Sequence, residues 1–490
     1  MSEEKEREAR IQALIEGKVP VELAKGKLIV LIGSWVLFIF IGVLALLDLL
    51  GPQATLIATI FSATLYGVYA YIVPCIILFV IATAAIVGTV WLMIYLLRRH
   101  GYSLLKFSII FFVILEWVIF FVALVFFGWQ TQLIFLLLTA AVGTILAVLY
   151  FTVWKMRLEL AGGILTITGQ VTKEEKELLV PGYLKVIFIG ILSMFGTIIG
   201  IDLFIHMVPP TGEIFWWHYV VTICYFFLLF LYLYINTYFF NAITTAITYI
   251  WYRKKDPTFH DGVAIATYQL PDIAVFAAFS AIIRVIRMVL QSLAKKSGTK
   301  PSWTGGGFRL ADGIIGTVWY YVNYFTLPSI VIEDVKATTA IKRSAHRLFD
   351  NWVDVLLKEW GISSVFNLLQ FLIIILFAGA GALFGALISW IYGLDLVVLI
   401  IVGVILFLFM STLVSKPFLN LLNDVYLTFL FGFVIDKESN FKYENNLPAE
   451  LNEKLREWFA AHPAVRRCQK CFAKVPEGAT SCPKCGAPYP

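Results

Sequence analysis

Four cysteines near the end of the chain have the spacing of a metal site. Two residues separate Cys468 from Cys471 and Cys482 from Cys485, and ten residues separate the two pairs. Each Cys-x2-Cys turn can present two thiolates to one tetrahedral ion, and two such turns complete the four-cysteine shell of a structural zinc. So short a piece has no core of its own, so metal binding would supply its folding energy. The sequence predicts a zinc ribbon at 466–490 that binds one structural Zn²⁺.

The chemistry of such a ribbon is structural. Four cysteine ligands close the coordination shell and leave no open position for a substrate. Two disulfides are the alternative for the same residues, but the spacing favours zinc. Reduced, zinc-loaded thiols are typical of the cytosol, so the ribbon also predicts that the C-terminus is cytosolic.

One carboxylate lies deep within an apolar stretch. Glu116 is near the centre of 107–127, where a charge is costly and normally faces the interior of a helix bundle. We favour a neutral, hydrogen-bonded structural residue, and a proton or cation site is the alternative. Arg284 and Arg287 share one face of a helix; a structural pair with acids such as Asp202 is favoured over lipid phosphate contact or snorkelling.

The segment 337–360 has the pattern of an amphipathic helix. Apolar residues recur at helical spacing on one face, and a basic face contains Lys342, Arg343 and Arg347. We predict that this helix lies at the inner membrane surface with its basic face toward anionic lipid headgroups. An ordinary cytosolic helix packed on the protein is the alternative.

No arrangement of residues indicates catalysis. The six histidines are scattered without metal-ligand spacing, and no Gly-x-Ser-x-Gly elbow is present. The glycine run 305–307 lacks the lysine and hydroxyl residue of a phosphate-binding loop. The sequence therefore predicts that the protein is not an enzyme.

Composition sets the class of protein. Hydrophobic residues make up 60% of the chain and charged residues 14%, and the mean hydropathy is +0.85. These values are typical of a polytopic membrane protein. The net charge of +6 lies in loops and does not indicate a nucleic-acid partner.

Hydropathy predicts an all-α fold with about ten transmembrane helices, each with the roughly 20 apolar residues that a span needs. The predicted spans are 28–50, 68–97, 107–127, 133–154, 184–208, 217–251, 272–294, 311–332, 362–390 and 396–415. Lysine and arginine alternate between loops in a way that places both termini inside. The pair 272–294 and 311–332 either crosses the membrane, which we favour, or forms a re-entrant hairpin.

The predicted spans divide the chain into a series of segments. These are a cytosolic tail at 1–27, a four-helix membrane block at 28–155, a polar linker at 156–182, a second membrane block at 183–436, a polar linker with a short helix at 437–465, and the ribbon. Alternation at 163–168 favours a short strand or hairpin within the first linker.

Two runs of residues carry a resemblance to a known family. Leu327-Pro-Ser-Ile-Val-Ile-Glu-Asp334 is followed by Ala340-Ile-Lys-Arg-Ser344, and Tyr238-Phe-Phe-Asn-Ala242 precedes Asp256-Pro-Thr258 and Asp261-Gly262. Over about 183–390 the chain resembles an uncharacterised family of prokaryotic integral membrane proteins. It is more distantly similar to the membrane domains of glycerophosphodiester phosphodiesterases. The resemblance implies the fold and a prokaryotic host, but it transfers no site.

Together these patterns predict a multi-pass protein of a prokaryotic cytoplasmic membrane with both termini cytosolic. Its expected role is a non-enzymatic scaffold that organises the membrane or a complex, with the ribbon as a docking module. The alternative is a transporter or channel for a small solute or lipid, with Glu116 and the two arginines along its path. The expected partners are membrane lipids and, through the ribbon, other proteins, with the chain acting alone or as an oligomer.

Overall fold

In a computed structural model most of the described residues are helical, and no strand occurs among them. The structure describes 3–51, 54–127, 131–207, 215–296, 303–350, 361–393, 395–439, 442–461, 475, 479 and 481–486. The first helices are α1 (Glu3–Ile15), α2 (Lys25–Leu50), α3 (Ala54–Phe127), α4 (Thr131–Thr152), α5 (Lys155–Glu174), the short 3-10 turn η2 (Lys176–Leu178), α6 (Leu179–Met207) and α7 (Trp216–Tyr252). The later ones are α8 (Phe259–Tyr268), α9 (Leu270–Lys296), α10 (Trp303–Val322), α11 (Thr326–Glu333), α12 (Ala337–Asp350), α14 (Ser363–Tyr392), α15 (Leu396–Glu438) and α16 (Ala449–Ala461).

Seven of the described helices are long and apolar enough to cross a membrane. They are α2, α3 over Ile76–Phe126, α6 together with the preceding η2 turn, α7, α9, α14 and α15. An eighth span results if α4 and α5 are counted as one helix pair, although they meet at a bend of 91°. The chain is therefore a multi-pass helical membrane protein, but the ten predicted spans are not confirmed.

Two features account for the difference between ten predicted spans and the eight obtained when α4 and α5 are counted as one. The predicted spans 68–97 and 107–127 both lie on α3, which consists of two helical pieces that meet at a kink at His100 (φ −131°, ψ 20°) without an intervening loop, so they count as one candidate among the seven. The predicted span 311–332 falls partly on α10, which contains Arg309, Asp312 and five glycines and is too polar to be a candidate span. Its partner α9 is apolar enough to be a candidate span, so the two helices of the predicted pair differ in their ability to cross a membrane.

The strand expected within 156–182 is wrong, because this region forms α5. Its apparent alternation arises because helix α5 is buried on more than one side, with Leu158, Ile164 and Ile167 all inside. Gly162 and Gly169 allow a close crossing with α3: a Cβ on either would meet the backbone or side chains of Tyr102 and Leu97. The expected polar linker is thus a packed structural element.

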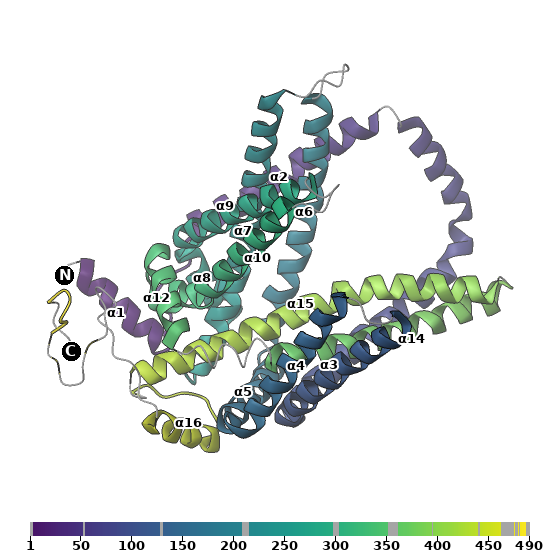
Figure 1. The fold of residues 1–490 in the computed structure, drawn as a ribbon. Helices are drawn as coiled ribbons and strands as arrows, with labels where there is room; N and C mark the ends of the chain where they lie inside the picture. The colour runs from purple at the N-terminus through teal and green to yellow at the C-terminus, as the bar shows by residue number, and fades with distance from the viewer. Residues whose placement is uncertain are drawn as a thin grey trace.

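The helices form two groups that are joined by α15. One group contains α2, α6, α7, α9 and α10, and the other contains α3, α4, α5 and α14. Helix α15 pairs with α14 along one half of its length and contacts α5, α6 and α7 with the other half. Figure 1 shows α14 and α15 as a projecting hairpin, while the opposite end of α15 lies near α1 and α16.

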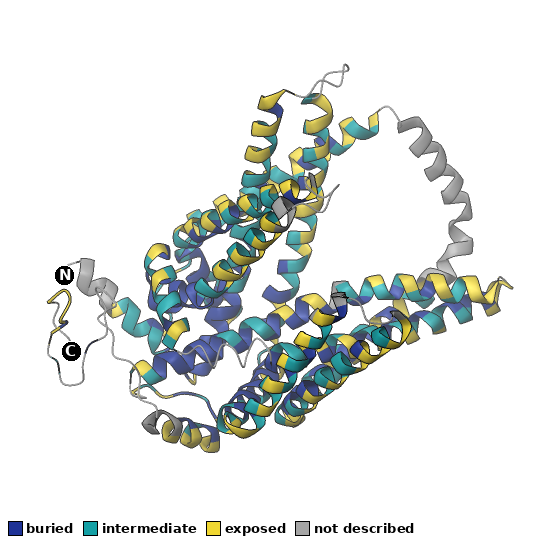
Figure 2. Ribbon diagram, in the orientation of Figure 1, coloured by how far each residue is buried: buried dark blue, intermediate teal, exposed yellow. Residues whose placement is uncertain are grey.

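Burial is concentrated where the two groups meet. Figure 2 shows dark blue segments gathered at that end of α15, and mixed teal and yellow along the projecting helices. The buried residues there include Tyr252, Phe325, Tyr426 and Phe429. By contrast Trp390 on the projecting hairpin is 83% exposed, as expected for a side chain that faces lipid.

Candidate functional site

The described end of the chain contains one of the two predicted cysteine turns. Cys482 is buried and Cys485 is exposed. The backbone N–H of Lys484 donates to Sγ of Cys482 at 3.4 Å, and Gly486 closes the turn with φ +65° and an N–H bond to the Cys482 carbonyl. An N–H donor at the sulfur suits a thiolate ligand, so this turn fits a structural zinc. Cys468 and Cys471 lie outside the described residues, so the complete ribbon stays a prediction.

The strongest polar cluster in the described structure surrounds Arg347 on α12. Its guanidinium makes two bonds to Glu333 on α11, at 2.7 and 2.9 Å, and two to Glu438 at the end of α15, at 2.6 and 2.9 Å. Arg343 adds a further bond to Glu333 at 3.1 Å. Such paired bonds to planar carboxylates are the strongest that arginine makes. The cluster therefore joins α11 and α12, which are neighbours in sequence, to the distant end of α15.

This geometry bears on the predicted lipid contact of 337–360. The structure places Lys342 on an exposed surface, whereas the Arg343 and Arg347 side chains are only 21% and 10% exposed and contact acids of the protein. The three residues therefore do not share one basic face here. Headgroup contact stays a prediction, and it is best tested at Lys342; residues 351–360 lie outside the described part.

Electrostatics reinforce the Arg347 cluster. Burial by itself would raise the pKa of Glu333, but the charge and hydrogen bonds of Arg347 outweigh it and lower that pKa to about 2. Glu333 is therefore ionised at neutral pH. A buried carboxylate of this kind depends on its cation, since neither partner can be removed without leaving an uncompensated charge.

A second buried cluster forms where α7 ends. Arg253 lies 2.6 Å from Asp436 on α15, with side chains that are 1% and 0% exposed. The Arg253 Nη1 and Asp436 Oδ1 atoms are in charge contact but are not oriented for a hydrogen bond. Tyr252 and Asn445 both donate hydrogen bonds to the other oxygen of Asp436. The guanidinium donates instead to the Tyr249 hydroxyl at 2.9 and 3.0 Å.

Both terminal segments attach to this second cluster. The Tyr249 hydroxyl donates to the carbonyl of Ile15, which ends α1. The backbone N–H of Asn446 donates to the carbonyl of Tyr252 at 2.7 Å. Gly17 adopts φ +73° beside the Arg253 side chain, where a Cβ would collide. The cluster thus fixes the N-terminal helix and the segment that leads to α16 against one end of the bundle.

A third polar contact lies between candidate spans. Lys185 on α6 donates to Asn241 on α7 at 2.8 Å and to Asp424 on α15 at 3.1 Å. Ionisable groups within spans are normally paired in this way. Sequence reasoning missed this contact, although a lysine and an aspartate within apolar runs are themselves a signal that each needs a partner.

The predicted arginine pair contacts a different acid from the one proposed. Arg287 donates to Asp312 on α10 at 2.7 Å, and Gln291 donates to the second oxygen at 2.9 Å. The Arg284 guanidinium lies 5.7 Å from the centre of the Phe230 ring. Asp202, the acid proposed as their partner, instead lies 3.4 Å from His206. Arg287 therefore holds α10 on α9, whereas Arg284 contacts α7.

Glu116 lies apart from both arginines. It lines a cavity of about 60 Å³ whose other polar side chains are Tyr150 and Ser364. Neither Arg284 nor Arg287 belongs to the lining. The structure thus does not bring the three predicted intramembrane residues into one site.

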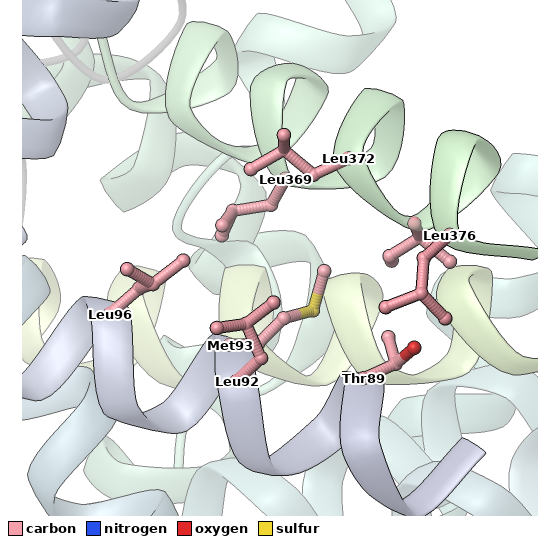
Figure 3. A pocket seen from close by; sticks show the side chains of 8 residues that line it. Thr89, Leu92, Met93, Leu96, Leu369, Leu372 and Leu376 are labelled. Carbon is pink, nitrogen blue, oxygen red and sulfur yellow. The ribbon is translucent and has the colours of Figure 1, made fainter. Parts of the chain in front are cut away.

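Two other features carry no site. Figure 3 shows an apolar pocket in which Leu92, Met93 and Leu96 of α3 face Leu369 and Leu372 of α14. Its volume of about 10 Å³ is no more than one water needs, so it is a packing seam. Asp48, Asp202 and His206 place ligand atoms within 4.8 Å of one another, but Asp48 and His206 are exposed and the group is too open to indicate a bound metal.

Comparison with protein families gives one match. Residues 220–441 are similar to a family of unknown function, DUF6159. The match covers just under half of the chain, from α7 to α15, and contains both acids that bind Arg347 as well as the Arg253–Asp436 pair. It fits the resemblance to an uncharacterised family, and it shows neither a glycerophosphodiester phosphodiesterase likeness nor a zinc ribbon. The search of curated proteins found no match.

Proposed function

We propose that the protein is a non-enzymatic scaffold of a prokaryotic cytoplasmic membrane that presents a zinc ribbon to cytosolic partner proteins. The observation that supports this role is the attachment of the chain before the ribbon. Residues 442–461 do not form a loose tether, because Asn445 and Asn446 bond to the ends of α15 and α7. Leu451 and Leu455 of α16 are buried.

The attachment of α16 restricts where the ribbon can go. Lys454 of α16 lies 3.4 Å from Glu159 of α5, and Leu451 packs at Gly163 of the same helix. Six residues separate the end of α16 from Cys468. Since an extended chain spans at most about 3.5 Å per residue, the first cysteine lies within about 25 Å of that end. The ribbon would therefore stay close to the helix bundle, as a docking module should.

The distribution of charge favours the scaffold over the transporter. A transport path would need Glu116 and the arginines along one polar route. In the described part of the chain, Lys185, Arg287 and Arg347 are instead each satisfied by acids of neighbouring helices. Such separate pairs stabilise an assembly of helices and do not line a route.

The test compares the wild type with a Cys482→Ser/Cys485→Ser variant, using Cys224→Ser as the matched control. We expect one zinc ion per chain in the wild type and in the control, and almost none in the double variant. The same cytosolic proteins should co-purify with the wild type and the control and be lost from the double variant. The melting temperature of the membrane part should be unchanged in all three proteins.

Metal analysis and mass spectrometry of the purified proteins provide the two readouts. Absence of zinc from the wild type would overturn the ribbon. An unchanged set of partners in a zinc-free double variant would overturn the docking role but leave the metal site intact.

Orientation is a separate prediction, tested in a chain whose Cys75 and Cys224 are alanine. A thiol reagent that cannot cross membranes should label an introduced Thr211→Cys in intact cells, but not Lys336→Cys or the native ribbon cysteines. After the cells are opened, Lys336→Cys should also react, because Lys336 is exposed. Labelling of Lys336→Cys in intact cells would contradict a cytosolic position for the Arg347 cluster.

A further inference from the structure

The cavity at Glu116 lies between three helices of one group. Helix α3 contributes Glu116 itself, α4 contributes Tyr150 and the start of α14 contributes Ser364. Apolar side chains complete the lining: Ile109, Phe112, Val113, Leu146 and Ala147, with Gly143. The volume of about 60 Å³ is several times the roughly 10–15 Å³ that one water molecule requires. The space can thus hold a small hydrated group beside the carboxyl.

The carboxyl of Glu116 needs a cation. Its Oε2 atom is buried and makes no hydrogen bond to the described residues, and no basic side chain is among the described residues that line the cavity. An ionised carboxylate without a partner is unstable within a span. Lys185 and Asp424, which also lie on candidate spans, satisfy each other, so Glu116 differs from them in this respect.

The lining suits a small cation of high charge density. Carboxylate and hydroxyl oxygens are hard ligands, which bind a hydrogen ion or Na⁺ in preference to soft metals. Among the described residues of the lining, Tyr150 is the other titratable one, and Ser364 supplies a second hydroxyl. Helices α4 and α14 contribute no acid to the described lining.

We propose that Glu116, with Tyr150 and Ser364, forms a reversible binding site for a small monovalent cation, either a hydrogen ion or Na⁺. This role is additional to the scaffold and does not depend on it. It differs from a structural glutamic acid, which would hold one proton at all times. Occupancy of the site would then follow the pH or the sodium concentration around the protein.

The test uses a hydrophobic carbodiimide on the purified full-length protein in detergent. The reagent adds to a protonated carboxyl, whose proton moves to a reagent nitrogen while the oxygen bonds to the central carbon. Rearrangement then gives a stable adduct that contains the whole reagent and is located by mass spectrometry. We expect labelling of Glu116 to fall at least tenfold between about pH 5 and pH 9, and Glu116→Gln to remain unlabelled at that position.

The two cations are distinguished by salt. If Na⁺ binds, sodium chloride should reduce labelling at a fixed pH and choline chloride should not; if only a hydrogen ion binds, the two salts should act alike. Infrared difference spectra between acid and alkaline pH supply a readout that does not need reagent access. They should contain a carboxyl carbonyl band that is missing from Glu116→Gln.

Substitutions of the hydroxyl residues test the composition of the site. Tyr150→Phe and Ser364→Ala each remove a hydroxyl that can donate to the carboxylate, so each should raise the midpoint of the titration by about one pH unit. Ser108→Ala is the matched control, because its buried hydroxyl donates to the Leu105 carbonyl on α3 and does not line the cavity. A carbonyl band that is constant over the whole pH range, with or without Na⁺, would show a permanently neutral residue and overturn the proposal.

Discussion

Arg347→Met should destabilise the protein by about 3 kcal/mol, at the lower end of the range for breaking a buried ion pair. Methionine retains most of the apolar volume of arginine, so the loss reports the charge and the hydrogen bonds rather than a cavity. Glu333 would remain buried and would keep Arg343, at 3.1 Å, and the Ser329 hydroxyl as partners. Glu438 would suffer less, because its side chain is 42% exposed and water can replace the guanidinium.

The measurement is chemical unfolding of the purified protein in mixed micelles. Lys342→Met is the control, since Lys342 is exposed on the same helix and its loss should change the free energy of unfolding by under about 0.5 kcal/mol. The double variant Arg347→Met/Glu333→Gln should lose less free energy of unfolding than the sum of the losses in the two single variants. Equal stability of Arg347→Met and Lys342→Met would show that the cluster does not hold α11, α12 and α15 together.

The same cluster gives a pH dependence whose sign follows from Glu333. Its pKa falls from an ordinary 4.5 to about 2 in the folded protein. The corresponding stabilisation, roughly 3 kcal/mol, is therefore complete above about pH 5 and is lost as the pH falls toward 2. In Arg347→Met the pKa of Glu333 should lie nearer 4.5, so this acid-dependent loss should shrink. Unfolding of both proteins at a series of acidic pH values measures the difference.

The sequence predicts the class of fold well because the membrane imposes a local rule. A span needs an apolar run of sufficient length, and such a run is visible in α2, α7 and α14 without knowledge of their neighbours. The number of spans is less accessible. Whether α3 turns back at His100 or continues through a kink depends on its packing against α5, and local hydropathy carries no information about that contact.

Ion pairs between distant residues are the main feature that the sequence does not reveal. The basic residues of 337–360 look like a surface for lipid because the sequence does not show which acids they bind. Arg347 in fact binds Glu438, which follows 91 residues later. A helical pattern identifies the polar face of α12, but it does not say whether that face meets lipid or another helix. The Glu116 cavity is a similar case. The sequence identifies Glu116 as a carboxylate in an apolar run, but it does not predict that Tyr150 and Ser364 lie beside it.

Gly385→Leu should have the second large effect, because it would force apart the α14–α15 hairpin. A Cβ at Gly385 would overlap the backbone carbonyl of Leu399, and Gly381 and Gly403 approach each other in the same way one turn along. Backbone atoms cannot move aside as a flexible side chain can, so the helices must separate. Small residues that permit such close approach are a main source of helix association in membranes.

We expect Gly385→Leu to lower the free energy of unfolding by about 1–3 kcal/mol, the usual range for overpacking, or to prevent accumulation of folded protein. Gly379→Leu is a matched control on the same helix, because no atom lies within 4 Å of its added Cβ. That variant should match the wild type, or gain slightly in helix propensity. A cysteine pair placed across the two helices near Trp390 and Val397 would report the separation through its rate of disulfide formation. If the Gly385 and Gly379 variants were equally stable and cross-linked at the same rate, close packing of α14 against α15 would be excluded. The arrangement in which α15 connects the two helix groups would then lose its support.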